Sequence, residues 1–479
     1  MRLKRNEFLG WSAVLCCSFV CGIYLLARIG FGHTYSSMAF LPFVFALCTV
    51  LFASVYTQLG SNIGLLCLHC LMIIRLVVTP FFMVQAGFQS HIKGITQQEV
   101  EKAVVLLSYE CLAMYFVLSR LTAKSKKQIL SGQLQTKEYA ISYDKPNGLF
   151  TLVLFALGIY CLVVWFILPS SRDLYKTVFD IANEDFTTVL YSAAQENVGS
   201  LKRAMLTLFK MVFDIVRILL PMYFLIFLKR RGAPLRMSIT TGLLLAGVQF
   251  LFIDSTTAKS IISAFLLISF LARLYPVQSK RIVNIAALIA TAAIVAYFLV
   301  RFLVGSRYGD DSTEYVSKIL NAYFGGVDNV AAGMNMPEGY AAATFWGGLY
   351  SAIPFNSSLF GLRVEHLQTL YNDINGSYGQ IPPMIIEGEY YFGVLLAPLV
   401  PCLCASAAYH YGEKFSHTSS AWHLVSNLFA SVLFAVSIVM YNQEILLSWL
   451  TNWLLPMGIL SWLAERERVR KNTRYETGI

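Results

Sequence analysis

Long apolar runs recur along nearly the whole chain. They are continuous rather than alternating, and each approaches the roughly 20 residues that a helix needs to cross a hydrocarbon core. Because backbone groups in lipid must bond internally, runs of this kind predict helices. The expected spans are residues 8–29, 37–56, 62–84, 100–119, 148–169, 206–228, 238–254, 259–274, 282–304, 386–410, 421–441 and 444–464. The pattern therefore predicts an all-α polytopic membrane protein with about twelve transmembrane helices.

One connection between spans is much longer than the others. Residues 305–385 carry their own apolar, aromatic and charged positions, so they are expected to form a small extracytoplasmic unit with short helices. The stretch "TEYVSKILNAYF" places apolar side chains on one helical face and ends before Gly325 and Gly326. The stretch "GLRVEHLQTLY" predicts a second short helix, on which Arg363 and His366 share a face.

The distribution of Lys and Arg predicts the orientation of the chain. With the N-terminus inside, the predicted inner segments carry 22 Lys and Arg and the predicted outer segments carry 8. Inner loops of membrane proteins are enriched in these residues, so both termini are expected in the cytoplasm. The chain then divides into nine membrane helices (1–304), an outer loop (305–385), three membrane helices (386–465) and a basic tail (466–479).

Composition supports this class of protein. Hydrophobic residues make up 57% of the chain and charged residues only 13%, which is unlike a soluble domain. The formal net charge of +10 is interpreted as anchoring to the anionic inner leaflet and not as nucleic-acid binding. The first apolar run follows a basic start but lacks a signal-peptide cleavage site, so it is expected to remain as an anchor.

The cysteines suggest no further chemistry. All ten lie within apolar segments, so no disulfide framework is expected. Cys67, His69 and Cys70 in "CLHC" resemble part of a metal site, but no second Cys/His cluster completes four ligands. Neither a metal nor another cofactor is therefore expected.

Charged residues inside the spans are the strongest sign of a function, because each is costly in lipid unless it is paired or hydrated. Lys210, Asp214 and Arg217 lie on one stripe of a predicted helix. This stripe is either a self-satisfied set of salt bridges or a cavity for a charged lipid headgroup. Further cations lie in or beside predicted spans: Arg75, Lys259, Arg301 and Arg307. Several lie at predicted outer ends, where an anionic ligand such as a polyprenyl pyrophosphate would explain them.

The architecture and two motifs resemble Wzy-type polysaccharide repeat-unit polymerases, which are related to the O-antigen ligases. The motifs are "ILNAYFGG" early in the long loop and "NGSYGQIPPMIIEGEYYFG" at its exit. Glu387, Tyr390, Phe392 and Gly393 match the Glu-x-x-Tyr-x-Phe-Gly-like helix entry of that family. The Ser/Thr-x-Arg step of the family has Lys259 in place of the arginine, which keeps the charge but loses the bidentate geometry.

The resemblance implies a glycosyltransferase of the bacterial cytoplasmic membrane. It would transfer a growing glycan from undecaprenyl pyrophosphate to a sugar hydroxyl of the next lipid-linked repeat, on the outer face and without a metal. Donor, acceptor and membrane lipid would be its ligands, and a chain-length regulator and a flippase its partner proteins. Glu387, His366 and Arg363 are the expected catalytic residues. The expected substrate and pyrophosphate ligands are Arg301, Arg307, Lys259, Arg217, Arg75, Tyr378 and Tyr390.

Other interpretations stay open at this point. Glu387 could be a helix-capping acid, and Glu389 a solvated acid at the helix start. The loop tyrosines could form an interfacial belt rather than stack on sugars. The protein could also be an O-antigen-ligase-like transferase with a different acceptor. A lipid-linked oligosaccharide flippase or other transporter is the third alternative, although the two halves of the chain show no similarity.

Overall fold

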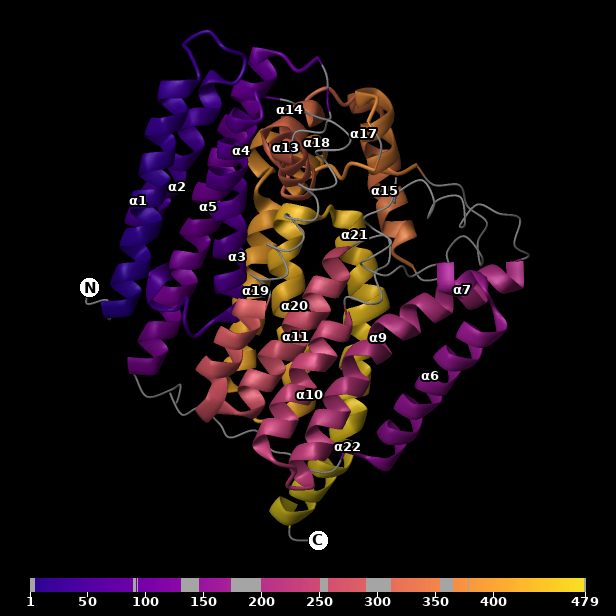
Figure 1. The fold of residues 1–479 in the computed structure, drawn as a ribbon. Helices are drawn as coiled ribbons and strands as arrows, with labels where there is room; N and C mark the ends of the chain where they lie inside the picture. Colours follow the sequence, from indigo (N-terminus) through magenta and orange to yellow (C-terminus); the bar gives the residue numbers. More distant parts are fainter. Residues whose placement is uncertain are drawn as a thin grey trace.

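The computed structural model describes residues 5–88, 92, 94–130, 146–173, 200–249, 257–289, 312–353, 365–377 and 379–477. Within these residues the chain is entirely helical apart from turns and loops (Figure 1). Eight helical stretches in this part of the chain are long and apolar enough to cross a membrane. They are Phe8–Arg28, Ile63–Gln85, Gln97–Ser125, Gly148–Ile167, Ala204–Arg230, Val394–His417, Ala421–Met440 and Gln443–Arg466. The protein is therefore a helical membrane protein.

The first half of the described chain combines long helices with shorter ones. They are α1 (Arg5–Arg28), η1 (Ser36–Phe40), α2 (Leu41–Leu51), α3 (Ile63–Ile73), the π-helical η3 (Ile74–Val78), α4 (Thr79–Gln85), α5 (Gln97–Leu130), α6 (Gly148–Ile167), α7 (Ser170–Asp173), α9 (Ser200–Arg230) and α10 (Leu235–Val248). The apolar stretches Ser36–Leu51 and Leu235–Val248 fall short of a full span. α3, η3 and α4 together form one span.

The second half combines long spans with short helices. They are α11 (Thr257–Leu274), α13 (Ser312–Tyr323), α14 (Val327–Gly333), α15 (Ala341–Ser351), α17 (Leu367–Asn375), α18 (Met384–Phe392), α19 (Leu399–His417), α20 (Ala421–Met440), α21 (Gln443–Trp449), the π-helical η9 (Leu450–Leu454) and α22 (Leu455–Thr477). The predicted helix "TEYVSKILNAYF" is confirmed as α13.

One predicted span is interrupted within its apolar run, and two other predicted spans belong to a bent pair. The expected span 386–410 is split, because α18 ends at Gly393, whose φ of 77° leaves the helical region, and the span begins at Val394. Lys259–Leu274 and Pro276–Ile289 form a pair bent by 114°, so they are either one broken span or a re-entrant loop. Residues 290–304 of the predicted ninth span lie outside the described residues.

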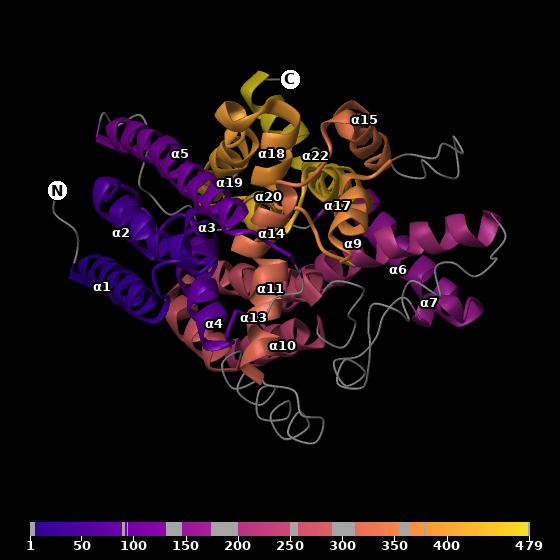
Figure 2. The same cartoon turned by 90° about the horizontal axis from the view of Figure 1, so that it is seen from above.

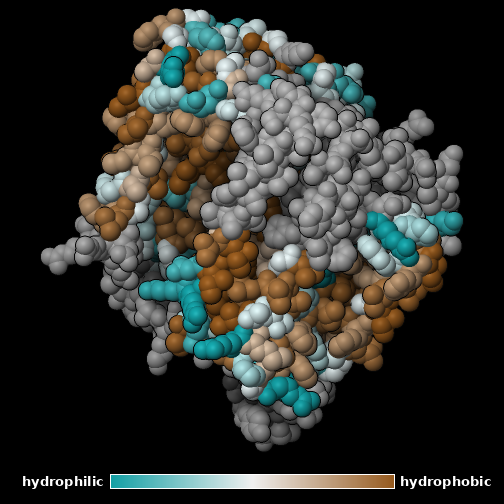
Figure 3. All heavy atoms as spheres, viewed as in Figure 1, coloured by the Kyte–Doolittle hydropathy of each residue, from teal (hydrophilic) through white to brown (hydrophobic). Residues whose placement is uncertain are grey.

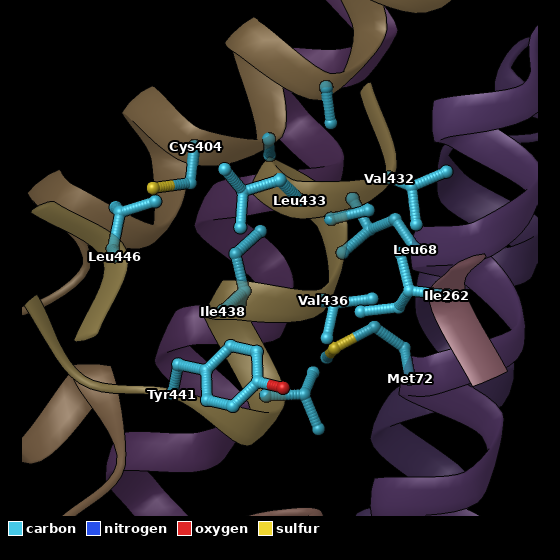
Figure 4. Close-up of a cluster of buried hydrophobic side chains, with 14 of the residues drawn as sticks. Leu68, Met72, Ile262, Cys404, Val432, Leu433, Val436, Ile438, Tyr441 and Leu446 are labelled. Carbon is cyan, nitrogen blue, oxygen red and sulfur yellow. The ribbon is translucent and has the colours of Figure 1, made fainter. Parts of the chain in front are cut away.

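The core is built around α20. This helix packs against α19, α3, α11 and α22, and 72% of its span is buried. Figure 4 shows the apolar contact, in which Val432 and Val436 of α20 lie beside Leu68 and Met72 of α3. The apolar side chains of α20 therefore support the span Ile63–Gln85 and the last span, Gln443–Arg466.

Polar side chains cap the ends of several core helices. Ser420 accepts a hydrogen bond from the His423 amide at the start of α20, and Asn442 accepts one from the Ile445 amide at the start of α21. Asn62 caps α3 in the same way, through the Leu65 amide. Each cap satisfies a backbone donor that the helix itself leaves without a partner, which fixes where the helix begins.

The short helices of the second half gather at one end of the bundle. Figure 1 shows α13, α14, α17 and α18 together, away from the end at which α22 leads to the C-terminus. The view from above shows them over the ends of the central helices (Figure 2). Hydrophobic residues cover much of the visible bundle in Figure 3, and hydrophilic residues lie mainly toward its two ends. The candidate site therefore lies where a short-helix layer meets apolar spans.

Candidate functional site

A partly exposed pair of charged side chains joins the short-helix layer to the last span. His366, the residue before α17, has its Nδ1 2.8 Å from Glu444 Oε1 of α21, and both side chains are partly exposed. The contact with Glu444 raises the pKa of His366 above its usual value, although partial burial opposes the shift. Glu444 lies in the first turn of α21, where the helix dipole favours a negative charge. The pair is thus a histidine held by a carboxylate near the surface.

His366 does not lie within a helix. It is the N-cap residue of α17, with β-region backbone angles, and Arg363 lies outside the described residues. The predicted sharing of a helix face by Arg363 and His366 is therefore wrong for His366, because α17 begins only at Leu367. The extended backbone before the helix lets the imidazole reach α21 instead.

Glu387 lies beneath this pair and is 3% exposed. Its Oε2 accepts a hydrogen bond of 2.5 Å from the Gln443 amide, the first residue of α21. Burial raises the pKa of Glu387 to about 8, which the hydrogen bond opposes and the nearby Glu444 reinforces. Glu387 is therefore a capping acid, but for α21 rather than for its own helix.

Close backbone packing places Glu387 in this position. A Cβ on Gly388 would lie 2.1 Å from the Ala397 carbonyl oxygen, so only glycine lets α18 approach the start of the next span so closely. Glu389, two residues after Glu387, is half-buried, and burial raises its pKa while Lys102 lowers it. The two glutamates therefore diverge, as their spacing on a helix predicts.

Replacing Glu387 tests the capping contact. We expect Glu387→Leu to lower the free energy of unfolding by about 1–3 kcal/mol, because the Gln443 amide loses its acceptor. Glu387→Gln keeps an acceptor oxygen and should cost much less. Thermal unfolding in detergent measures both variants, and Glu101→Gln on the exposed face of α5 is the control. Equal losses for Leu and Gln would show that the hydrogen bond is unimportant.

The raised pKa of Glu387 also predicts a pH dependence. The folded chain binds this proton more tightly than the unfolded chain, so the stabilisation is complete below about pH 4.5 and is lost as the pH rises through about 8. We therefore expect the unfolding temperature of the wild type, relative to Glu387→Gln, to fall between about pH 5 and pH 8 and to level off above pH 8. A constant difference across this range would contradict the raised pKa.

A fully buried ion pair lies between the spans nearby. Arg75 Nη1 in η3 is 2.7 Å from Glu110 Oε2 in α5, and neither side chain is exposed. Arg75 Nε donates to the Gly325 carbonyl oxygen over 2.9 Å, which ties the loop between α13 and α14 to the spans. Gly325 has a φ of 54°, a conformation that favours glycine. Arg75 therefore holds the loop in place and does not reach the surface in this conformation.

A polar network stabilises the segment that follows Gly325. Asn321 Nδ2 donates to Asp328 Oδ2 over 3.0 Å, and Asn329 Nδ2 donates to the carbonyl oxygens of Asn321 and Ala322. The Tyr371 hydroxyl of α17 donates to the Asn329 carbonyl oxygen. Every residue of α14 is buried. The stretch "NAYFGGVDN" is thus a rigid support that fixes α17, and so the approach of His366 to α21.

A third charged cluster lies deeper between α9 and α11. Asp214 Oδ2 is 3.1 Å from Lys259 Nζ, and Asp214 Oδ1 is 3.4 Å from Arg217 Nε. The Lys259 ammonium also lies over the Trp449 and Trp453 rings, 5.7 and 5.3 Å from their centres. These contacts match the interpretation of the stripe as a set of salt bridges, because Lys259 and Arg217, the two predicted phosphate ligands, share the Asp214 carboxylate. Their predicted role in binding pyrophosphate stays a prediction.

The remaining predicted site residues have mixed positions. Arg301, Arg307, Arg363 and Tyr378 lie outside the described residues. The Tyr390 hydroxyl donates to the Pro337 carbonyl oxygen over 2.7 Å, so this side chain links α18 to the segment before α15. His69 of the "CLHC" stretch is buried, and its Nδ1 lies 2.6 Å from the Tyr115 hydroxyl. Among the described residues, no group of three or more His, Cys, Asp or Glu side chains is placed to hold a metal ion.

Sequence reasoning did not identify Glu110 and Glu444. Glu110 lies in the predicted span 100–119, and Glu444 opens the predicted span 444–464, so the intramembrane charge pattern contained a signal for both. Their partners are distant in sequence, which is why the pattern did not pair them. No protein-family model, curated protein or solved structure matches the chain at a significant level.

Proposed function

We propose that this membrane protein is a glycosyltransferase that polymerises lipid-linked oligosaccharide repeat units at the outer face of the bacterial cytoplasmic membrane. The donor is a growing glycan on undecaprenyl pyrophosphate, and the acceptor is a sugar hydroxyl of the next lipid-linked repeat. Both termini of the chain lie in the cytoplasm. The motifs of residues 319–326 and 375–393 support this assignment through their resemblance to the Wzy-type polymerases.

The observation that carries the proposal is the pair formed by His366 and Glu444. A base held by a carboxylate, partly exposed where a layer of short helices meets the last span, suits the activation of a hydroxyl at a membrane surface. Glu444 engages Nδ1, which leaves Nε2 to accept a proton. The pair lies at the end of the bundle that the charge distribution predicts to face outward.

The reaction needs one bond to form and one to break. The acceptor oxygen attacks the anomeric carbon of the donor sugar as His366 Nε2 takes the hydroxyl proton, and a glycosidic C–O bond forms. The bond between the anomeric carbon and the pyrophosphate oxygen breaks, and the lipid pyrophosphate leaves with the electron pair. Cationic side chains neutralise this leaving group, and Arg301, Arg307 and Arg363 remain the candidates for that role.

Glu387 has a positioning role in this proposal. Its hydrogen bond to the Gln443 amide fixes the first turn of α21, which carries Glu444. Glu387→Gln is then expected to retain polymer formation. An inactive Glu387→Gln protein of normal stability would instead support the catalytic role that the motif predicts for this glutamate.

Deletion of the gene in its host tests the function directly. Lipid-linked glycans are resolved by size and by leaflet in the deletion strain and in the complemented strain. Single repeat units accumulating on the outer leaflet are the expected result. Units retained on the inner leaflet would indicate a flippase, and long polymer on undecaprenyl pyrophosphate would indicate a ligase; either result would overturn the proposal.

A further inference from the structure

A groove of about 520 Å³ lies on the flank of the last two spans, apart from the charged site. Leu450, Leu454 and Leu455 of the π-helical segment and its continuation form much of its wall, and Ser426 and Asn427 of α20 add two polar positions. Gly458 lies along the same wall, and a Cβ at this residue would meet no atom within 4 Å. The missing side chain therefore helps to keep the groove open within a membrane span.

Asn427 is the first sign that the groove has a ligand. Its side-chain amide forms no hydrogen bond with any residue that the structure describes, although it lies in the span Ala421–Met440. An amide without a partner in hydrocarbon is costly. Asn427 is about 9 Å along the helix axis from Ala421, so it lies in the part of the span nearer the leaflet at which α20 begins. Lipid ester carbonyls lie at the headgroup side of that leaflet and accept hydrogen bonds.

Two cations beside aromatic rings that line the groove are the second sign. The Lys414 ammonium lies 5.2 Å from the centre of the Tyr411 ring, and the Arg466 guanidinium lies 5.5 Å from that of Trp462. Both rings line the groove. Neither cation forms an ion pair within the described part of the chain. Two positive groups beside rings that line the groove favour an anionic headgroup.

We propose that this groove binds one anionic glycerophospholipid from the leaflet at the end where α20 begins. One acyl chain lies along Leu454 and Gly458, the Asn427 amide donates to an ester carbonyl, and Lys414 and Arg466 contact the phosphate. The inference does not depend on the proposed polymerase activity, because the groove includes neither His366 nor Glu444.

Native mass spectrometry of the purified full-length protein in detergent tests the site, with phosphatidylglycerol and phosphatidylcholine of equal chain length as probes. We expect the wild type to bind one phosphatidylglycerol about tenfold more tightly than phosphatidylcholine, since two cations contact the headgroup. Lys414→Gln combined with Arg466→Gln should remove this preference and leave phosphatidylcholine binding unchanged. Equal binding of the two lipids by the wild type would overturn the proposal.

Gly458→Leu fills the groove without a clash against the protein. It should weaken the binding of both phosphatidylglycerol and phosphatidylcholine about tenfold or more. Gly158→Leu is the matched control, because Gly158 of α6 also faces open space within a span. Asn427→Leu is a second variant. It should weaken the binding of both lipids and conserve the preference for phosphatidylglycerol over phosphatidylcholine. Equal binding by Gly458→Leu and Gly158→Leu would overturn the site. Preferential displacement of phosphatidylglycerol by undecaprenyl phosphate would assign the groove to a polyprenyl lipid. Dimers that are lost only in Gly458→Leu would assign it to a second copy of the chain. Either result would overturn the phospholipid proposal.

Discussion

Replacing His366 with glutamine is expected to reduce polymer formation by about 10²- to 10⁴-fold, the usual contribution of a positioned acid–base group. Glutamine approximates the size of the ring but accepts no proton at neutral pH. The side chain is partly exposed, so the loss should not come from unfolding. The measurement is polymer made per molecule of membrane-inserted protein in the deletion strain, with single repeat units quantified in parallel.

The chain offers a matched control for this variant. His423 Nε2 lies 3.3 Å from Glu465 Oε2, a second histidine–glutamate pair of similar exposure at the other end of the last span. His423→Gln removes the same kind of contact far from the proposed site, so polymer formation should stay within about twofold of the wild type. Comparable losses in the two variants would mean that the effect of His366→Gln is structural.

The pH profile separates a catalytic histidine from a structural one. Glu444 raises the pKa of His366, so wild-type activity should increase with pH until the imidazole is mostly neutral, somewhat above pH 6.5. Glu444→Gln removes the carboxylate, and the remaining effect of burial lowers the pKa. The acid limb of the profile should therefore move to lower pH in Glu444→Gln. An unshifted limb would show that His366 does not titrate in the reaction.

The sequence predicted helix positions best where caps bound an apolar run. The predicted spans 62–84, 148–169 and 421–441 agree closely with Ile63–Gln85, Gly148–Ile167 and Ala421–Met440. Asn62, Asn147 and Ser420 cap these helices, so a polar residue marks the start of each run. The break inside the run 386–410 was missed, because Gly393 changes the backbone with little effect on the mean hydropathy of the window.

The partners of the site residues depend on tertiary structure. Glu387 was predicted as important from its motif, but its contact with the Gln443 amide requires α18 to lie beside the start of α21. The His366 contact with Glu444 likewise depends on the support of α17 by the Asn329 carbonyl oxygen. Local periodicity contains no information on such contacts, so sequence reasoning named candidate residues without naming what they touch.

The buried pair of Arg75 and Glu110 is expected to make the largest contribution to stability among the described charges. Arg75→Met leaves the Glu110 carboxylate without its ion-pair partner in a fully buried position and frees the Gly325 carbonyl oxygen. Removing one partner of such a pair typically lowers the free energy of unfolding by about 3–5 kcal/mol. Thermal or denaturant unfolding in detergent, followed by intrinsic fluorescence, should show this loss, and Glu110→Leu should show a similar one.

The double variant tests whether the cost arises from the orphaned charge. Arg75→Met combined with Glu110→Leu removes both charges, so it should be more stable than either single variant, with a residual loss from the Gly325 carbonyl oxygen. Arg120→Met, on the exposed face of α5, is the control and should change stability by less than about 0.5 kcal/mol. Additive losses in the double variant would contradict the pairing. Because Arg75 also holds the loop that supports α17, the single variants should lose polymer formation together with stability, whereas His366→Gln should lose polymer formation alone.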